Sequence, residues 1–303
     1  MINILRVSNL PHDMLTVLQT TYLVHDRDHI TDPGALGRIR AMVAADQTVI
    51  DRKLLMLFPA VEVICVCSGS LQGIDLAAAA ERKIKVIHTP HVQIPDVAEF
   101  AMGMLLACTR RIAQADRFVR NSDWVDGPYP MTRRLSGGRL GLVGMGDLSQ
   151  AIAQRAKAFD MVVHYTAQQE VPASGGVFHP SVKDLAAQVD FLMLAESGPE
   201  ATAKVVNADV LQTLGLNGYL INLANAAAVD QVALIEALQK KALGGVALDV
   251  FPEEPRVAAE LRNAPNVVLT PHIASATHEA RQAMVESALR QLAEHFAQEL
   301  KPA

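Results

Sequence analysis

A histidine and a carboxylate near the end of the chain could together move a proton. His272 follows Thr270 and Pro271, and an imidazole gains and loses a proton near neutral pH. Glu254 could orient that ring and favour its protonated form, which would supply a proton to a carbonyl group under reduction. Two plainer interpretations stay open, in which His272 is a hydrogen-bonded side chain of a Thr-Pro turn and Glu254 is a solvated loop charge.

A glycine-rich segment is the second candidate for chemistry. It reads Gly141-Leu-Val-Gly144-Met145-Gly146-Asp147-Leu148-Ser149, and it follows a strand-like run and opens a helical pattern, as a dinucleotide loop does. Gly144 is expected to make the tight turn, and Gly146 to let a pyrophosphate approach the helix N-terminus. Ser149 replaces the third glycine of the fingerprint, and Asp147 would repel a pyrophosphate. The alternative is the ordinary turn of a fold that no longer binds a dinucleotide well.

The choice between NAD and NADP depends on the end of the next expected strand. An acid there would hold the adenosine ribose of NAD, and an arginine would favour NADP. The residues are Thr166-Ala167-Gln168-Gln169, and no acid or arginine occurs before Glu170. The cofactor is therefore expected to be NAD or NADP, with no preference indicated.

Short apolar runs alternate with helical patterns along the chain, which predicts parallel sheets covered by helices. Asn225, Asp249 and His272 each follow an expected strand, at the edge where a doubly wound sheet places its ligands. Asp230 is expected to cap the helix that follows it. The strands of a first series are expected at 2–7, 21–24, 39–43, 61–66 and 85–88, and those of a second at 140–143, 161–165, 191–194, 219–223, 245–248 and 267–269.

A long apolar helix is expected from Val97 to about Arg120. Asp96 at its N-cap with Glu99 three residues later is a capping signal. Its apolar side chains are nearly continuous, which indicates a buried helix, and a second copy of the chain is one surface that could cover it. A homodimer is therefore expected.

Composition excludes several classes of protein. The chain has 303 residues and a net charge of −5, so a nucleic-acid partner is not expected. It has no run of 18 apolar residues, and the start at Met1 does not resemble a signal peptide, so no membrane span and a cytoplasmic location are expected. Cys65, Cys67 and Cys108 are interpreted as small core side chains, with no disulfide framework and no metal site.

These segments together resemble the D-isomer-specific 2-hydroxyacid dehydrogenase family. The resemblance is closest to its glyoxylate/hydroxypyruvate and hydroxyphenylpyruvate reductase branch, and it covers nearly the whole chain. It implies a doubly wound Rossmann domain at 97–278, inserted in a smaller flavodoxin-like α/β domain formed by 1–96 and 279–303. The segments that carry it are 140–165, 219–255, 266–279, the run Ser68-Gly69-Ser70-Leu71-Gln72-Gly73-Ile74-Asp75, Thr89-Pro90 and Val97-Ala98-Glu99.

The resemblance also implies roles for particular residues. His272 falls on the family's acid/base, Glu254 on its supporting carboxylate and Asp249 on an acidic position near the nicotinamide. Backbone amides around Ser70 and Leu71 would meet the carboxylate of a small 2-oxo or 2-hydroxy acid. The cofactor would contact Gly144, Met145, Gly146, Asp147, Leu148 and Thr166.

One departure separates this chain from the family pattern. The family's catalytic arginine falls on Asn225 and the glycine after it on Ala226, so a permanent charge for the substrate carboxylate is missing. Three hypotheses therefore remain: a working oxidoreductase, a ligand-binding or regulatory protein, and altered acid–base chemistry on a substrate without a carboxylate. Arg133 or Arg134 could reach the cleft from their loop and replace the lost charge.

Overall fold

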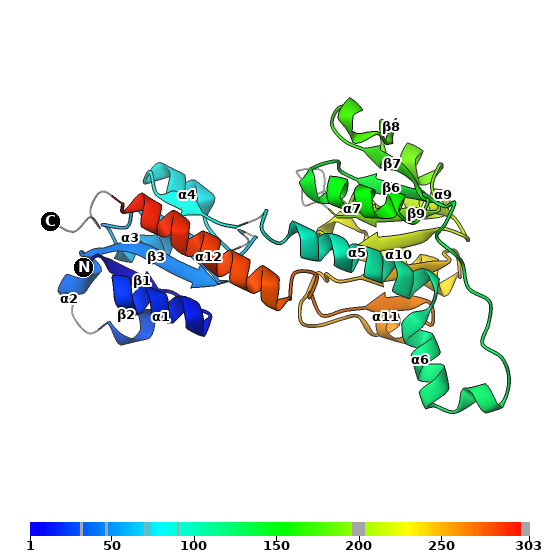
Figure 1. Cartoon of the computed structure of the whole chain (residues 1–303), viewed down its shortest axis with the longest axis horizontal. Coiled ribbons are helices and arrows are strands. Elements are labelled where there is room, and N and C mark those ends of the chain that lie inside the picture. Colours follow the sequence, from blue (N-terminus) through cyan, green and yellow to red (C-terminus); the bar gives the residue numbers. More distant parts are fainter. Residues whose placement is uncertain are drawn as a thin grey trace. The chain divides into compact units, whose positions relative to one another are not determined.

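The chain divides into two compact units, each with its own parallel sheet. The structure is a computed structural model that describes residues 1–30, 33–45, 48–69, 71, 73–89, 91–195 and 204–297. One unit combines Met1–Gln93 with Ala276–Ala303, and the other is Ile94–Ser275. Figure 1 shows both units and labels many of their strands and helices.

The first unit has a five-stranded parallel sheet in the order β2-β1-β3-β4-β5, which is the flavodoxin-like order. Its strands are β1 (Asn3–Arg6), β2 (Leu23–Asp26), β3 (Ile39–Ala45), β4 (Val63–Cys67) and β5 (Lys85–Ile87). Its helices are α1 (His12–Thr21), α2 (Pro33–Leu36), α3 (Arg52–Leu57), α4 (Leu76–Glu81) and α12 (His278–His295), with a short 3-10 turn at Arg27–His29.

Both faces of this sheet are apolar, because helices cover both. One core joins the sheet to α1 and α12, and Leu292 of α12 and Phe296 directly after it are among its buried side chains. The other core joins the sheet to α3 and α4, around Leu55 and Ala79. Helix α12, from the end of the chain, therefore helps to cover a sheet whose strands all come from the start of the chain.

The second unit has a seven-stranded parallel sheet in the order β12-β11-β10-β9-β6-β7-β8. The strand order reverses between β6 and β9, which is the doubly wound Rossmann arrangement, so the predicted fold class is confirmed. Its strands are β6 (Arg139–Val143), β7 (Val162–Thr166), β8 (Val177–His179), β9 (Phe191–Leu194), β10 (Tyr219–Asn222), β11 (Gly245–Leu248) and β12 (Val267–Leu269).

Two groups of helices cover the two faces of the seven-stranded sheet. One face packs against α5 (Ile94–Thr109) and α7 (Asp147–Lys157), which lie against each other (Figure 1). The other face packs against α8 (Val182–Ala186), α9 (Ala208–Leu214), α10 (Gln231–Gln239) and α11 (Ala259–Asn263). The remaining elements are α6 (Ile112–Arg120) and 3-10 turns at Asp123–Val125, Pro172–Ser174 and Ala226–Ala228.

The predicted helix from Val97 to Arg120 is wrong in its start and its continuity. The helix begins at Ile94, so Asp96 lies in its first turn rather than at the N-cap. It stops at Thr109, because Arg111 adopts the left-handed conformation with φ 51°, and α6 then starts again in a new direction. The apolar side chains of α5 are buried within its own unit, so this helix does not itself require a second copy.

The three cysteines are free and buried, as predicted. Burial raises the pKa of the Cys108 thiol to about 12 and that of Cys67 to about 11, so both remain protonated and unreactive at neutral pH. Within the described ranges, no helix is long and apolar enough to cross a membrane.

Candidate active site

Three neighbouring strands bring the candidate residues to one edge of the Rossmann sheet. Strands β10, β11 and β12 are parallel, and their last residues Asn222, Leu248 and Leu269 are aligned in register. The chain segments that follow these residues therefore begin at the same carboxyl edge. Those segments carry Asn225, Asp249 with Glu254, and His272.

The structure brings His272 and Glu254 into hydrogen-bonding distance. The Nδ1 atom of His272 lies 2.9 Å from Oε2 of Glu254, and the other carboxylate oxygen accepts a hydrogen bond of 3.0 Å from the Phe251 backbone N–H. The side chain of Glu254 is 26% exposed and that of His272 is 47% exposed. With Nδ1 donating to the carboxylate, Nε2 of the ring is left for a reacting group.

A buried carboxylate fixes the loop that carries His272. Asp249 is fully buried at the end of β11, and its Oδ1 accepts hydrogen bonds from Thr270 Oγ1 at 2.6 Å and the Ile273 N–H at 2.9 Å. Its Oδ2 accepts another from the Ala274 N–H at 2.9 Å. These three bonds lie on both sides of His272 in the chain, and they hold it in a left-handed conformation with φ 54°.

Asn225 is part of a capped turn at the same edge. Its side-chain oxygen accepts a hydrogen bond of 2.9 Å from the Ala227 N–H, which starts the short turn at Ala226–Ala228. Its backbone carbonyl accepts one of 3.0 Å from Nδ2 of Asn222, a buried asparagine. The side-chain amide of Asn225, which stands where the resemblance implies an arginine, thus stabilises a turn.

The backbone of the glycine loop fits a pyrophosphate. Gly144 has φ 96°, a conformation that favours glycine, and its N–H donates to the Thr166 carbonyl at 2.9 Å. Gly146 is the N-cap of α7 and has no side chain that could cap the helix itself, and a helix N-terminus of this kind attracts an anion. Asp147 is exposed in the first helical turn, where its charge opposes that anion.

The remaining cofactor candidates differ in exposure. Met145 is buried in the core, and Leu148 is partly buried against it. Thr166 is 4% exposed at the end of β7, whereas Gln168 and Gln169 after it are exposed. No acid or arginine follows β7 directly, so the structure adds no preference for NAD or NADP.

The candidate substrate loop belongs to the other unit. Ser70 lies outside the described residues, and so do Gln72 and Pro90. Leu71 is described: its carbonyl accepts a hydrogen bond of 3.1 Å from the Ile74 N–H, and its side chain packs on the first unit's core.

Arg133 does not supply the missing charge. Its guanidinium donates to Asp190 at 2.7 Å and to the Asn217 carbonyl at 3.2 Å, at the amino-terminal ends of β9 and β10. That edge is opposite to the edge of His272. Arg134 is exposed on the same loop.

Sequence reasoning missed the positions that build the site's backbone. Asn222 donates to the Asn225 carbonyl and accepts from the Ala224 N–H at 3.2 Å, and the use of Asp249 and Thr270 to hold the loop around His272 was not expected. A signal existed for Asn222, because an asparagine ending an apolar run must find partners when it is buried.

Comparisons with known proteins give one consistent result. The family model for the NAD binding domain of D-isomer specific 2-hydroxyacid dehydrogenases matches residues 102–274. A glyoxylate/hydroxypyruvate reductase A, HPR2, from Arabidopsis thaliana is 39% identical over 85% of this chain and 82% of that protein. A hydroxyphenylpyruvate reductase from Plectranthus scutellarioides is 36% identical over the same shares.

Solved structures agree with these relatives. A 2-hydroxyacid dehydrogenase from Ketogulonicigenium vulgare Y25 superposes with a TM-score of 0.91 at 35% identity, covering 98% of this chain and 96% of that one. An NADPH-dependent glyoxylate/hydroxypyruvate reductase from Sinorhizobium meliloti, in complex with NADP and malonate, gives 0.88 at 32% identity, covering 97% and 93%.

Proposed function

The chain belongs to the D-isomer specific 2-hydroxyacid dehydrogenase family, and we propose that it transfers a hydride between NAD(P) and a small 2-oxo or 2-hydroxy acid. The observation that carries the proposal is the 2.9 Å hydrogen bond between His272 and Glu254 at the carboxyl edge of a Rossmann sheet. That edge is where this sheet order binds its ligands.

The chemistry of the proposal follows from the protonation of His272. Glu254 accepts a hydrogen bond from Nδ1 and stabilises the charged ring. Nε2 then donates its proton to the carbonyl oxygen of the substrate as the carbonyl carbon is reduced. The hydroxyl product carries that proton, and the reverse reaction returns it to the neutral ring. Asp249 is a positioning residue, because it holds the loop on either side of His272.

The cofactor would be held by the glycine loop and α7. Gly144 supplies the turn, and the N-terminus of α7 after Gly146 would bind the pyrophosphate. When bound, the nicotinamide supplies or accepts the hydride. Thr166 and the residues directly after it would face the adenosine end of the cofactor. These residues carry no charge that would select NAD over NADP.

Glyoxylate, hydroxypyruvate and arylpyruvates are the first substrates to test, because the relatives are named for glyoxylate, hydroxypyruvate and hydroxyphenylpyruvate. The oxidation of NADH and NADPH by the purified chain should depend on one of these acids. His272→Gln should lower kcat by about 10²-fold or more, because it removes the general acid. His278→Gln, an exposed histidine on α12, is the matched control and should leave the rate unchanged. No turnover with any pair of cofactor and acid would overturn the proposal.

A second candidate is a family member that binds ligands without rapid turnover, or that carries out altered acid–base chemistry. It is favoured by Asn225, whose side chain is uncharged and engaged in its own turn. Losing one electrostatic contact of the arginine type commonly lowers a rate by about 10²–10³-fold. Calorimetry with NAD(H) and NADP(H) separates the two: tight binding without reduction favours this candidate, and rapid reduction removes it.

We further propose a homodimer, supported by the segment after α5. No residue of α6 is buried, and large apolar side chains are exposed there, among them Ile112, Val119, Trp124 and Val125. Exposed apolar surface of this kind is typical of an interface. Light scattering should give a dimer mass, and Trp124→Ser with Val125→Ser should give monomers. A monomeric native chain would contradict it.

A cytoplasmic location is proposed on the three buried free thiols, which suit a reducing compartment. Cell fractionation with an antibody against the chain tests this.

A further inference from the structure

A large pocket lies at the edge of the Rossmann sheet opposite to the candidate active site. It encloses about 690 Å³ beside the first residues of β11 and β12, and it is lined by the ends of α10 and α11. Asp249 and His272 follow the other ends of these two strands, and Asn225 follows the same end of the neighbouring strand β10, so the pocket takes no part in the proposed reaction.

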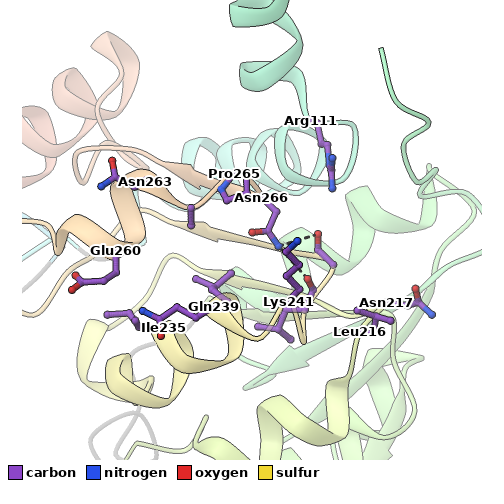
Figure 2. Close-up of a pocket in the computed structure, with 14 residues that line it drawn as sticks. Arg111, Leu216, Asn217, Ile235, Gln239, Lys241, Glu260, Asn263, Pro265 and Asn266 are labelled. Atoms are coloured by element: carbon purple, nitrogen blue, oxygen red, sulfur yellow. Dashed lines mark hydrogen bonds between the residues drawn. The ribbon is translucent and has the colours of Figure 1, made fainter. Parts of the chain in front are cut away.

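The pocket combines an apolar wall with charged ends. Ile235, Leu238 and Leu243 provide apolar surface from α10 and the loop after it. Figure 2 shows Arg111 and Asn217 toward one end and Glu260 toward the other, with Lys241 between them. A volume of this size that combines apolar surface with polar groups able to orient a ligand is typical of small-molecule sites.

Two cationic side chains line the pocket without making a polar contact within the described residues. Within the described ranges, neither the Arg111 guanidinium nor the Lys241 ammonium has a hydrogen bond or ion pair. Both residues are in the left-handed conformation, with φ 51° and 53°, which side chains other than glycine and asparagine rarely adopt. The chain thus keeps an arginine and a lysine at positions where glycine or asparagine would be more stable.

A fixed amide completes the polar side of the pocket. Asn266 donates from Nδ2 to the carbonyl oxygens of Leu243 at 3.1 Å and Gly244 at 3.4 Å, as Figure 2 shows. These bonds orient its Oδ1 as an acceptor for a ligand donor. The carboxyl ends of α10 and α11 also reach the pocket, and their partial negative charge limits how much anionic charge it can hold.

We propose that this pocket binds a small monocarboxylic acid with an aromatic or branched aliphatic body. The carboxylate is held by Arg111 and Lys241, and the body lies on Ile235, Leu238 and Leu243. Glu260 lies toward the other end of the pocket from Arg111 (Figure 2), so the two cations can pair locally with one carboxylate, whereas the several negative charges of a nucleotide phosphate would be repelled by Glu260 and the helix carboxyl ends.

The test uses calorimetry on the full chain with 3-phenylpropionate, and with 3-phenylpropanamide as its uncharged counterpart. The acid should bind saturably with a Kd of about 1 mM or tighter, and the amide more weakly. Lys241→Gly and Arg111→Asn should each weaken acid binding about tenfold, because each removes one cation. Both substitutions suit the left-handed backbone, so the fold should be kept. Ile235→Trp should fill the pocket and abolish binding.

Lys83→Gly is the matched control. Lys83 follows α4 with φ 58°, and its N–H donates to the carbonyl three residues earlier, as that of Lys241 does after α10, but Lys83 lies in the other unit. It should bind the acid as the native chain does. The proposal is overturned by the absence of saturable binding, by acid affinity that neither cation variant changes, or by an equal loss in Lys83→Gly. It is also overturned if Ile235→Trp converts an oligomer to monomers, because the pocket would then receive another copy of the chain. No nicotinamide enters the test, so its outcome is independent of the proposed reaction.

Discussion

Replacing Asp249 with asparagine should destabilise the Rossmann unit, although the two side chains have the same shape. The carboxylate accepts three hydrogen bonds, two at Oδ1 and one at Oδ2. An amide can keep the bonds from Thr270 and Ile273, but its NH₂ group would face the Ala274 N–H, donor against donor. One bond to a charged group is lost and a buried donor is left unsatisfied.

The expected loss is about 2–3 kcal/mol in the free energy of unfolding. A hydrogen bond to a charged group contributes roughly 1.5–3 kcal/mol, and an unsatisfied buried donor costs about 1–3 kcal/mol. Relief from burying a charge offsets part of the sum. Urea unfolding followed by circular dichroism measures the change. The kcat of the proposed reaction should fall as well, because the loop that positions His272 is loosened.

Asp230→Asn provides the control for this experiment. Asp230 caps α10, as predicted, and accepts hydrogen bonds from the N–H groups of Val232 and Ala233. Asparagine caps a helix as well as aspartate does, and the exposed ion pair with Lys204 contributes little, so a change below about 1 kcal/mol is expected. Equal losses in the two variants, or no loss in Asp249→Asn, would refute the reasoning.

Three further predictions concern the site, the pH response and the packing. Asn225→Arg combined with Ala226→Gly should raise the rate of 2-oxo acid reduction by about 10²-fold, because the guanidinium restores a charge for the carboxylate; an unchanged rate would show that another step limits the activity. Burial lowers the pKa of His164 in the folded chain below its ordinary value of 6.5, so between the folded and the ordinary pKa the unfolded chain binds more protons at this site. The free energy of unfolding should therefore fall as the pH drops through that range, and urea titrations of His164→Gln should lack the contribution of this site to that fall. Gly103→Ala should stabilise α5 by about 0.5–1 kcal/mol, because its Cβ meets nothing within 4 Å, whereas Gly138→Ala should destabilise by about 1–3 kcal/mol, because its Cβ would lie 2.6 Å from the Phe191 ring; melting temperatures that move together would contradict this.

The sequence predicted the buried strands best. Runs such as Phe191–Leu194 and Gly245–Leu248 are fully buried, so every residue is apolar and the ends are sharp. The sequence predicted six strands for the second sheet and did not predict the seventh, β8. This strand is three residues long and has no buried residue, so it has no apolar pattern to detect. The break between α5 and α6 was also hidden, because an arginine in a left-handed conformation gives no signal comparable to glycine or proline.

The candidate site could be predicted only in part. His272 and Glu254 were expected to act together, and the structure places them in contact. The three bonds of Asp249 could not be foreseen, because they join the end of β11 to the loop after β12, and only the paired strands create that proximity. The pocket beside Lys241 is assembled from segments far apart in sequence, so no local pattern indicates it.

The division of the first unit between two distant segments has a consequence for biosynthesis. Its five strands and α1 leave the ribosome first, but α12, which covers the same face of the sheet as α1 through Val285 and Leu292, is made only after Ile94–Ser275. At usual translation rates that interval is on the order of 10–40 s. During it the Rossmann unit can fold, while the part of the earlier sheet that α12 later covers is an exposed apolar surface and a target for a chaperone.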